Sequence, residues 1–196
     1  MEKIDYTEYM LSDEFFRANV AMSEKAGEIH EDVNQEYDDK PYIYHLLAVR
    51  GFAVKYLPYV CEKKEDVIPI VFGALFHDTI EDARLTYNDV MKIAKEYMSD
   101  NQAYLATEIV YALTNEKGRN RHERANDKYY QGIRETKYAP LVKAADRLAN
   151  YNYAKLTHSR MEKCYQEEME DFVKSAITSE NGDLLVPQEM IDELFM

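Results

Sequence analysis

Four residues with metal-binding side chains are spread along the chain: His45, the adjacent pair His77 and Asp78, and Asp146. Two imidazole nitrogens and two carboxylate oxygens form a mixed ligand set that suits manganese, iron or zinc. Two aspartates neutralise a divalent charge, and four ligands leave room for water and a phosphate oxygen. A bound cation acidifies such a water and polarises a phosphoryl group. If the fold brings them together, these four residues could form a divalent-metal site.

Two further acids, Glu81 and Asp82, follow the His77-Asp78 pair. On a continuous helix, Glu81 shares a face with His77, and Asp82 with Asp78. Burying four ionisable groups at the end of an apolar segment is costly unless they are paired or hold a metal. Carboxylates beside a metal site orient water or transfer protons, and we predict this role for Glu81 and Asp82. The alternative is an exposed helix end with solvated acids.

The segments that carry these residues are expected to be helical, because their apolar residues recur at steps of three and four. The expected helices span residues 11–29 with Ser12 or Asp13 as cap, 41–57 beginning at Pro41, 67–83 capped by Asp66, 86–98 capped by Thr86, 105–113, 140–148 opening at Pro140, 159–177, and a short helix after Pro187. No run alternates apolar and polar residues at period two. The sequence predicts an all-α fold with one compact domain over residues 1–196.

The positions of the candidate ligands favour burial. Residues 67–76 are apolar nearly all round, which predicts a buried central helix that leads into His77. Asp146 and Asn150 lie four residues apart on a helix of largely small or apolar residues, so the aspartate is expected in a sheltered place. Considered alone, a histidine between apolar neighbours such as His45 is more often a core residue than a ligand, and Asp146 could form a solvent-facing ion pair with Arg147.

The composition restricts the partners. The chain has 196 residues and a formal net charge of -13, which argues against a general binder of nucleic acid or anionic membranes. It has no recognisable export signal and no apolar run approaching the ~18 residues of a membrane span. Cys61 and Cys164 lack metal-binding spacing and form no disulfide framework, so a reducing, cytoplasmic location is expected. Without a GxG or GxxxxGK motif, a Rossmann or P-loop phosphate site is excluded.

One stretch departs from this acidic character. Residues 114–137 hold seven basic residues against four acidic ones, a local balance of +3. The basic residues are Lys117, Arg119, Arg121, Arg124, Lys128, Arg134 and Lys137. The stretch precedes the Asp146 helix and could form an electropositive mouth for an anionic substrate, with Arg121, Arg124 and the nearby Lys143 as candidate binding residues. A solvated charged segment with internal ion pairs is the alternative.

Three segments, PYIYHLLAVRG, ALFHDTIEDARLT and LVKAADRLANY, carry the candidate ligands. Their order of a histidine, a His-Asp pair 32 residues later and an aspartate 68 residues further on resembles the pattern of the HD-domain phosphohydrolases. More narrowly, HDxxED followed by KxADRLxN resembles the hydrolase domain of the Rel/SpoT alarmone proteins and the stand-alone small alarmone hydrolases. The resemblance runs from about Ser12 to Asn150, with the motif-bearing part at residues 12–157 and amphipathic helices over residues 158–196.

The resemblance implies a single HD domain that uses Mn²⁺, with Fe or Zn as alternatives. The implied reaction removes the 3'-pyrophosphate of guanosine 3',5'-bispyrophosphate (ppGpp) and releases GDP and pyrophosphate. The resemblance also implies that Glu81 and Asp82 are catalytic, that Asn150 contacts the substrate sugar and that Tyr42 lies near the base. The expected partner is a small-molecule nucleotide rather than a nucleic acid or a membrane.

Two departures from the alarmone hydrolases concern nucleotide recognition rather than metal binding. Where that family has Arg-Lys-x-Gly-x-Pro-Tyr, this chain has EYDDKPY at residues 36–42, and Asn152-Tyr153 replaces a frequent Arg-Thr pair. An HD phosphatase or phosphodiesterase for another nucleotide is therefore an alternative, and so is a non-catalytic nucleotide sensor. The apolar stripe of residues 159–177 either closes the core or mediates self-association into a homo-oligomer.

Overall fold

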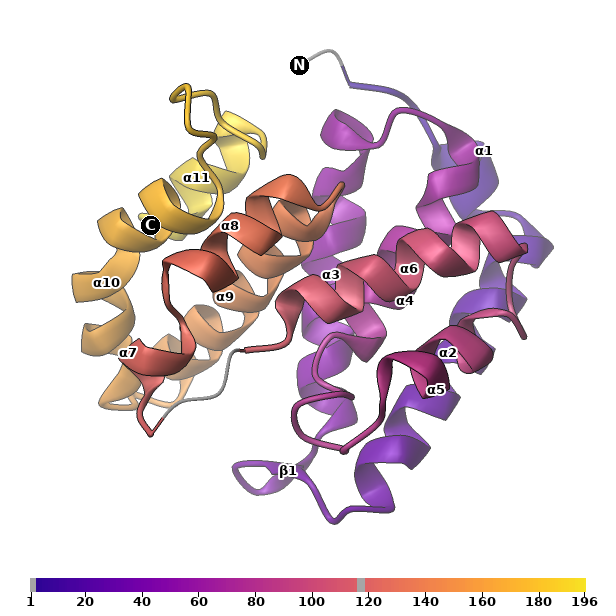
Figure 1. Ribbon diagram of the computed structural model, residues 1–196, viewed down its shortest axis with the longest axis horizontal. Helices are drawn as coiled ribbons and strands as arrows, with labels where there is room; N and C mark the ends of the chain where they lie inside the picture. The colour runs from indigo at the N-terminus through magenta and orange to yellow at the C-terminus, as the bar shows by residue number, and fades with distance from the viewer. Residues whose placement is uncertain (1–2, 116–118) are drawn as a thin grey trace.

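The computed structural model describes residues 3–115 and 119–196, apart from the side chains of Arg121 and His122. Helices dominate this range, which confirms the predicted all-α class (Figure 1). The longer helices are α2 (Asp13–Glu31), α3 (Ile43–Val60), α4 (Val67–Phe76), α6 (Asp100–Leu113), α9 (Ala139–Leu156) and α10 (Met161–Ala176). The shorter helices are α1 (Thr7–Met10), α5 (Tyr87–Ala94), α7 (Arg121–Arg124), α8 (Asp127–Glu135) and α11 (Gln188–Leu194), with a 3-10 turn at Lys64–Asp66.

Helices α3 and α9 pack against each other where two groups of helices meet. In Figure 1, α1–α6 form one side of the molecule in indigo to pink, and α8–α11 form the other in orange to yellow. Helix α4 packs against α3, α6 and α2, and all of its residues are buried, which confirms the predicted central helix. Gly73 lets α6 approach this closely, because a Cβ at that position would lie 2.5 Å from Cγ2 of Ile109.

Two predicted caps are confirmed and one is replaced by a tertiary contact. Ser12 Oγ accepts a hydrogen bond from Phe15 N (3.2 Å) at the start of α2, and Thr86 forms a capping box at α5. Asp66 makes no side-chain cap at α4. Its carboxylate accepts a hydrogen bond from Tyr138 Oη (2.7 Å) instead, and this bond ties the start of α4 to the start of α9.

The end of α4 differs most from the sequence prediction. The helix stops at Phe76, about two turns before the apolar and acidic pattern ends. Two side chains compete with the helical hydrogen bonds: His77 Nδ1 donates to Ala74 O (3.0 Å), and Thr79 Oγ1 donates to Phe76 O (2.7 Å). Residues 77–83 therefore form a turn rather than a continuation of the helix.

A small hairpin of β1 (Glu36–Tyr37) and β2 (Lys40–Pro41) lies outside the sequence prediction, because such short strands show no alternation. Asp38 in its turn adopts a left-handed φ of 54°, which aspartate tolerates better than most residues. Pro41 lies in β2 rather than in the first turn of α3. The hairpin brings the ring of Tyr37 onto the ring of His45, with the two centroids 4.8 Å apart.

The C-terminal helices complete the core. Met169, Phe172 and Ile177 of the predicted stripe are buried in the common core, so the stripe closes it. Helix α8 forms inside the basic stretch, where Asn126 Oδ1 caps it by accepting a hydrogen bond from Tyr129 N (3.1 Å). Among the described residues, no helix combines the length and the apolar character that crossing a membrane requires.

Candidate metal centre

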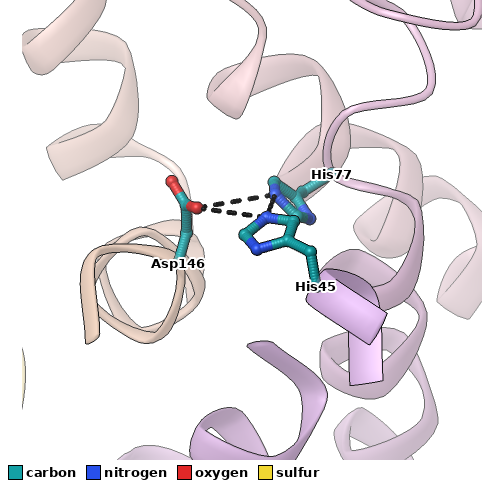
Figure 2. A group of neighbouring side chains, drawn as sticks. All are labelled: His45, His77 and Asp146. Carbon is teal, nitrogen blue, oxygen red and sulfur yellow. Dashed lines mark hydrogen bonds and ion pairs between the residues drawn. The ribbon is translucent and has the colours of Figure 1, made fainter. Parts of the chain in front are cut away.

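Three side chains from separate segments converge at one point: His45 from α3, His77 directly after α4, and Asp146 from α9 (Figure 2). The two Nε2 atoms lie 3.3 Å apart. Asp146 Oδ1 faces them, 3.5 Å from His45 Nε2 and 3.8 Å from His77 Nε2. The ligand atoms all lie within 4.8 Å of one another, and both imidazoles are buried. These three residues could therefore hold a metal ion.

Asp78, the fourth predicted ligand, lies against the same cluster. Its Oδ2 is 2.8 Å from His77 Nε2 and 3.6 Å from His45 Nε2. Tyr42 Oη donates a hydrogen bond to this oxygen (2.6 Å). The structure thus brings all four predicted ligands together, and we refer to His45, His77, Asp78 and Asp146 as the ligand cluster.

The contacts of the imidazoles suit metal-binding histidines. A carbonyl can only accept, so the 3.0 Å hydrogen bond between His77 and Ala74 O places a proton on Nδ1. Histidines that bind metals commonly donate from the second nitrogen in this way, which leaves Nε2 for the ion. His45 Nδ1 has no hydrogen-bond partner in the described part of the chain, and its ring is held by stacking on Tyr37. With the mixed nitrogen and oxygen donors, these contacts fit a divalent transition metal.

Opposite charges link the residues of the ligand cluster. Burial disfavours a charged His77, but Asp78 and Asp146 outweigh it and raise the pKa of His77 to about 9. Burial also disfavours the ionised carboxyls, yet the imidazoles hold the pKa of Asp78 well below its ordinary value. Lys143, followed by the imidazoles, lowers the pKa of Asp146 against the effect of burial. A cation held at His77 Nε2 would take the place of a proton there.

Tyrosine and asparagine side chains hold the two carboxylates from the side of α3 and the hairpin. Tyr42 bonds Asp78 directly, while Tyr37 Oη donates to Asn150 Oδ1 (2.9 Å). Asn150 Nδ2 in turn donates to Asp146 Oδ1 (2.6 Å). Tyr42 and Asn150, which the family resemblance assigns to the base and the sugar, are thus bonded to carboxylates of the ligand cluster.

His30 lies behind Tyr42, with the two ring centroids 4.5 Å apart and the rings stacked. The side chain is fully buried, and neither ring nitrogen has a hydrogen-bond partner among the described residues. Burial lowers the pKa of His30 to about 4, although the nearby carboxylate of Asp78 acts in the opposite direction. His30 is therefore a neutral, buried ring that stacks on Tyr42.

Asp82, one of the two predicted catalytic acids, faces the ligand cluster across Tyr42. Its Oδ2 accepts hydrogen bonds from Tyr42 Oη and from Gln35 Nε2, each at 3.3 Å. Burial, and then the carboxylates of Asp78 and Glu81, raise the pKa of Asp82 to about 6. The expected proximity of Asp82 to Asp78 is present, because one tyrosine hydroxyl contacts both.

Glu81 points to a different part of the site. Its carboxylate accepts hydrogen bonds from Asn115 Nδ2 at 2.8 and 3.0 Å and lies 3.4 Å from Arg124 Nη1. The expectation that Glu81 shares a helix face with His77 is wrong, because α4 ends before both residues. Glu81 instead links the turn after α4 to the end of α6 and to α7.

Few of the predicted basic residues reach the site. Lys143 Nζ donates to Asp146 Oδ2 (3.0 Å), and Arg124 contacts Glu81. Lys117 and the side chain of Arg121 lie outside the described residues. Other cations of the stretch bind elsewhere: Arg119 to Glu123, Arg134 to the carbonyl of Ser175, and Lys137 to Glu62 and Asp66.

Three residues near the site were not candidates on sequence grounds: Tyr37, Asn115 and Arg147. Tyr37 lies in the segment that departs from the alarmone hydrolases, so the departure itself was a usable signal. Asn115 lies beside the basic stretch, but nothing in its surroundings predicts a bond to Glu81. Arg147 is nearly buried, with its guanidinium 4.5 Å from the ring centroid of Phe172.

Comparison of the chain with protein-family models, with curated proteins and with solved structures finds no match in any of the three. A functional assignment therefore depends on the side chains of the site itself. These are the two buried imidazoles, the two carboxylates that face them, and the two further acids Asp82 and Glu81.

Proposed function

We propose that this chain is a metal-dependent phosphohydrolase of a nucleotide. The first candidate reaction is the hydrolysis of ppGpp to GDP and pyrophosphate. The observation that carries the proposal is the convergence of His45, His77, Asp78 and Asp146 from three separate segments. Such a buried group of imidazoles and carboxylates is costly to maintain without a ligand. The same four residues are the ones that the HD-domain resemblance selects from the sequence.

Manganese is the metal that we propose, with iron and zinc as alternatives, because all three accept nitrogen and oxygen donors. The four residues of the ligand cluster would hold the ion. When bound, a divalent cation acidifies water and polarises a phosphoryl group. The chain's own acids and cations then have to orient the reactants and move protons.

Asp82 and Glu81 are placed for that task. Asp82 is held beside Asp78 by the hydroxyl of Tyr42, so its carboxylate can accept a proton from the water that attacks phosphorus. Glu81 is held by Asn115 on the other side of the turn, where it can orient water or a leaving group. In this scheme, hydrolysis requires both Asp82 and Glu81.

The hairpin favours a second candidate, an HD phosphatase or phosphodiesterase for a different nucleotide. Tyr37 stacks on His45 and bonds the amide oxygen of Asn150, the residue that the resemblance assigns to the substrate sugar. A sugar that uses Asn150 must therefore displace Tyr37 or bind beside it. A substrate with a different base or sugar position avoids that competition.

Hydrolysis assays on the metal-stripped full chain test the proposal. The protein is supplied with Mn²⁺ and offered ppGpp, cyclic dinucleotides, nucleoside monophosphates and NADPH in separate reactions. Release of pyrophosphate from ppGpp supports the first candidate. Turnover confined to another nucleotide supports the second, and nucleotide binding without any turnover would favour a non-catalytic sensor.

Two variants and a matched control tie any activity to this site. Asp78→Asn and Glu81→Gln each remove one negative charge and should lower kcat by at least about 100-fold. The control is Asp100→Asn, which removes an exposed carboxylate at the start of α6. The site lies at the other end of this helix, where Asn115 binds Glu81. Asp100→Asn should leave kcat unchanged. Equal activity in all four proteins would assign the hydrolysis to a contaminant.

A further inference from the structure

A cavity of about 90 Å³ lies beside the ligand cluster, between α8 and α9. Its volume is several times the ~15 Å³ that one water needs. Arg147 also lines a wider hollow of about 380 Å³ that extends toward α10. The residues that line the smaller cavity include Asn115, Arg124, Lys143, Arg147, Tyr129 and Tyr130.

The charge of this lining is opposite to that of the chain. Arg124, Lys143 and Arg147 are cations, and none of the described lining residues is acidic, although the chain has a net charge of -13. Two of these cations are well shielded, with side-chain exposures of 18% for Lys143 and 8% for Arg147. Each has a carboxylate partner that does not line the cavity. The partners of the three cations are Glu81, Asp146 and Glu168, respectively.

The cations have more donors than these partners use. An ammonium group carries three N–H donors and a guanidinium carries five. The described ion pairs are single contacts: Arg124 Nη1 to Glu81 at 3.4 Å, and Arg147 Nη1 to Glu168 at 3.1 Å. Asn115 adds a polar side chain to the same wall. Phosphate oxygens, with their charge and several lone pairs, match such a set of donors.

The cavity is joined to the ligand cluster by one carboxylate. Asp146 Oδ1 faces the imidazoles of His45 and His77, while Asp146 Oδ2 accepts the hydrogen bond of Lys143 Nζ. Lys143 therefore lies between the metal-binding position and the cavity. Glu81, four residues after His77 in the chain, binds the lining residues Asn115 and Arg124.

We infer that this cavity is a phosphate subsite, which binds a second phosphoryl group of a substrate whose first phosphoryl group lies at the ligand cluster. The substrate class is then a diphosphate ester rather than a monophosphate. The inferred substrate class rests on the proposed function, whereas the inference that the cavity binds phosphate does not. Arg147, Asn115 and Arg124 become residues that select for a phosphate chain.

Calorimetric titration of the metal-stripped full chain with inorganic phosphate tests the subsite without any turnover. Arg124→Gln should weaken phosphate binding by about tenfold, because it removes a charged donor from the lining. Ala125→Leu fills the cavity and keeps every charge, and it should weaken binding at least as much. Arg119→Gln removes the same charge from an exposed residue outside the cavity and should change the affinity less than about twofold.

These variants separate the cavity from the general field of the basic stretch. Equal losses in Arg124→Gln and Arg119→Gln, or an unchanged affinity in Ala125→Leu, would overturn the subsite. Failure of the wild-type chain to bind phosphate would do the same. Circular dichroism of each variant establishes that the fold is retained, and Arg124→Lys should restore part of the affinity lost in Arg124→Gln.

A second measurement keeps the subsite distinct from the proposed function. In the Mn²⁺-loaded protein, Ala125→Leu should lower kcat/KM for nucleoside diphosphate esters by about tenfold more than for monophosphates. If no nucleotide is hydrolysed while the phosphate titrations behave as expected, the proposed function fails and the subsite stands. If monophosphates and diphosphates lose activity equally, the inferred selection for a diphosphate is wrong.

Discussion

The two sides of the ligand cluster are built from opposite chemistry. On the side of α3 and the hairpin, Tyr37 stacks on His45 and on Tyr44, and tyrosine hydroxyls donate to neutral or carboxylate oxygens. On the side of α8 and α9, the cations Arg124, Lys143 and Arg147 line the cavity of about 90 Å³. We call these the tyrosine side and the basic side. The comparison indicates that the tyrosine side fixes the ligands, while the basic side is left open for an anion.

Asp146 belongs to both sides, so its replacement has the largest expected effect. Asp146→Asn removes the charge that faces the imidazoles and leaves Lys143 without its carboxylate. We expect Mn²⁺ affinity to fall by about 1,000-fold, because loss of a ligand exceeds the 10- to 100-fold cost of losing a supporting residue. The Mn²⁺-dependent rise in Tm should then disappear.

The matched control for Asp146→Asn is Asp100→Asn, which removes an exposed carboxylate. Its Tm should still rise with Mn²⁺ as in the wild type. If Asp146→Asn keeps the full rise in Tm, the metal binds elsewhere, and Asp146 does not join the two sides at a metal site.

The burial of the tyrosine side can be tested through the pH dependence of His30. Its pKa is lowered to about 4 in the folded protein, against 6.5 for an unperturbed histidine. Both states hold a neutral ring above pH 6.5, and the unfolded chain alone takes up the proton as the pH falls from 6.5 to 4. The folded protein should therefore lose about 3 kcal/mol of stability over this range through His30.

Chemical denaturation of His30→Phe at pH 7 and at pH 4 isolates that contribution. The stability of the variant relative to the wild type should rise by about 3 kcal/mol at the lower pH. His158→Asn changes an exposed histidine at a φ of 52°, which asparagine tolerates, and should show no such rise. Parallel pH profiles for His30→Phe and the wild type would mean that water reaches His30.

A smaller loss is expected from Tyr42→Phe, which removes the 2.6 Å hydrogen bond to Asp78. The ring and its stacking on His30 remain. Mn²⁺ affinity, measured by calorimetry, should fall by about tenfold, because the carboxylate loses the donor that orients it. Tyr44→Phe removes an exposed hydroxyl from the same group of rings and serves as the control. A loss of similar size in both variants would make the effect one of packing.

The sequence predicts those parts of the molecule that depend on local patterns. Apolar spacing, Ser12 and Thr86 as caps, and the apolar run of α4 identify the helices, since each of these signals acts within a few residues. The four candidate ligands can be selected in advance because their chemical types and separations match the pattern of the resembled family. The sequence does not show that these residues converge, because their convergence depends on the packing of α3, α4 and α9.

What the sequence misses depends on competing or long-range hydrogen bonds. The pattern carries α4 beyond Phe76, but Thr79 and His77 bond carbonyls of the last turn and end the helix. Tyr37 reaches Asn150 across more than half the chain through a hairpin too short to leave a periodic signal. The basic stretch is visible as a charge balance, but the charge balance does not show that Arg124, at the end of α7, is the cation that reaches Glu81.

The smallest expected effect has the opposite sign and comes from the basic side. Lys143→Met removes an ammonium ion that bonds Asp146 and repels a cation at the ligand cluster. Mn²⁺ should therefore bind about fivefold more tightly, whereas Tyr42→Phe weakens the same equilibrium. The matched control, Lys92→Met on α5, should not change it. Weaker Mn²⁺ binding by Lys143→Met would show that Lys143 serves the metal by holding Asp146 in place, and the two sides would then share one role.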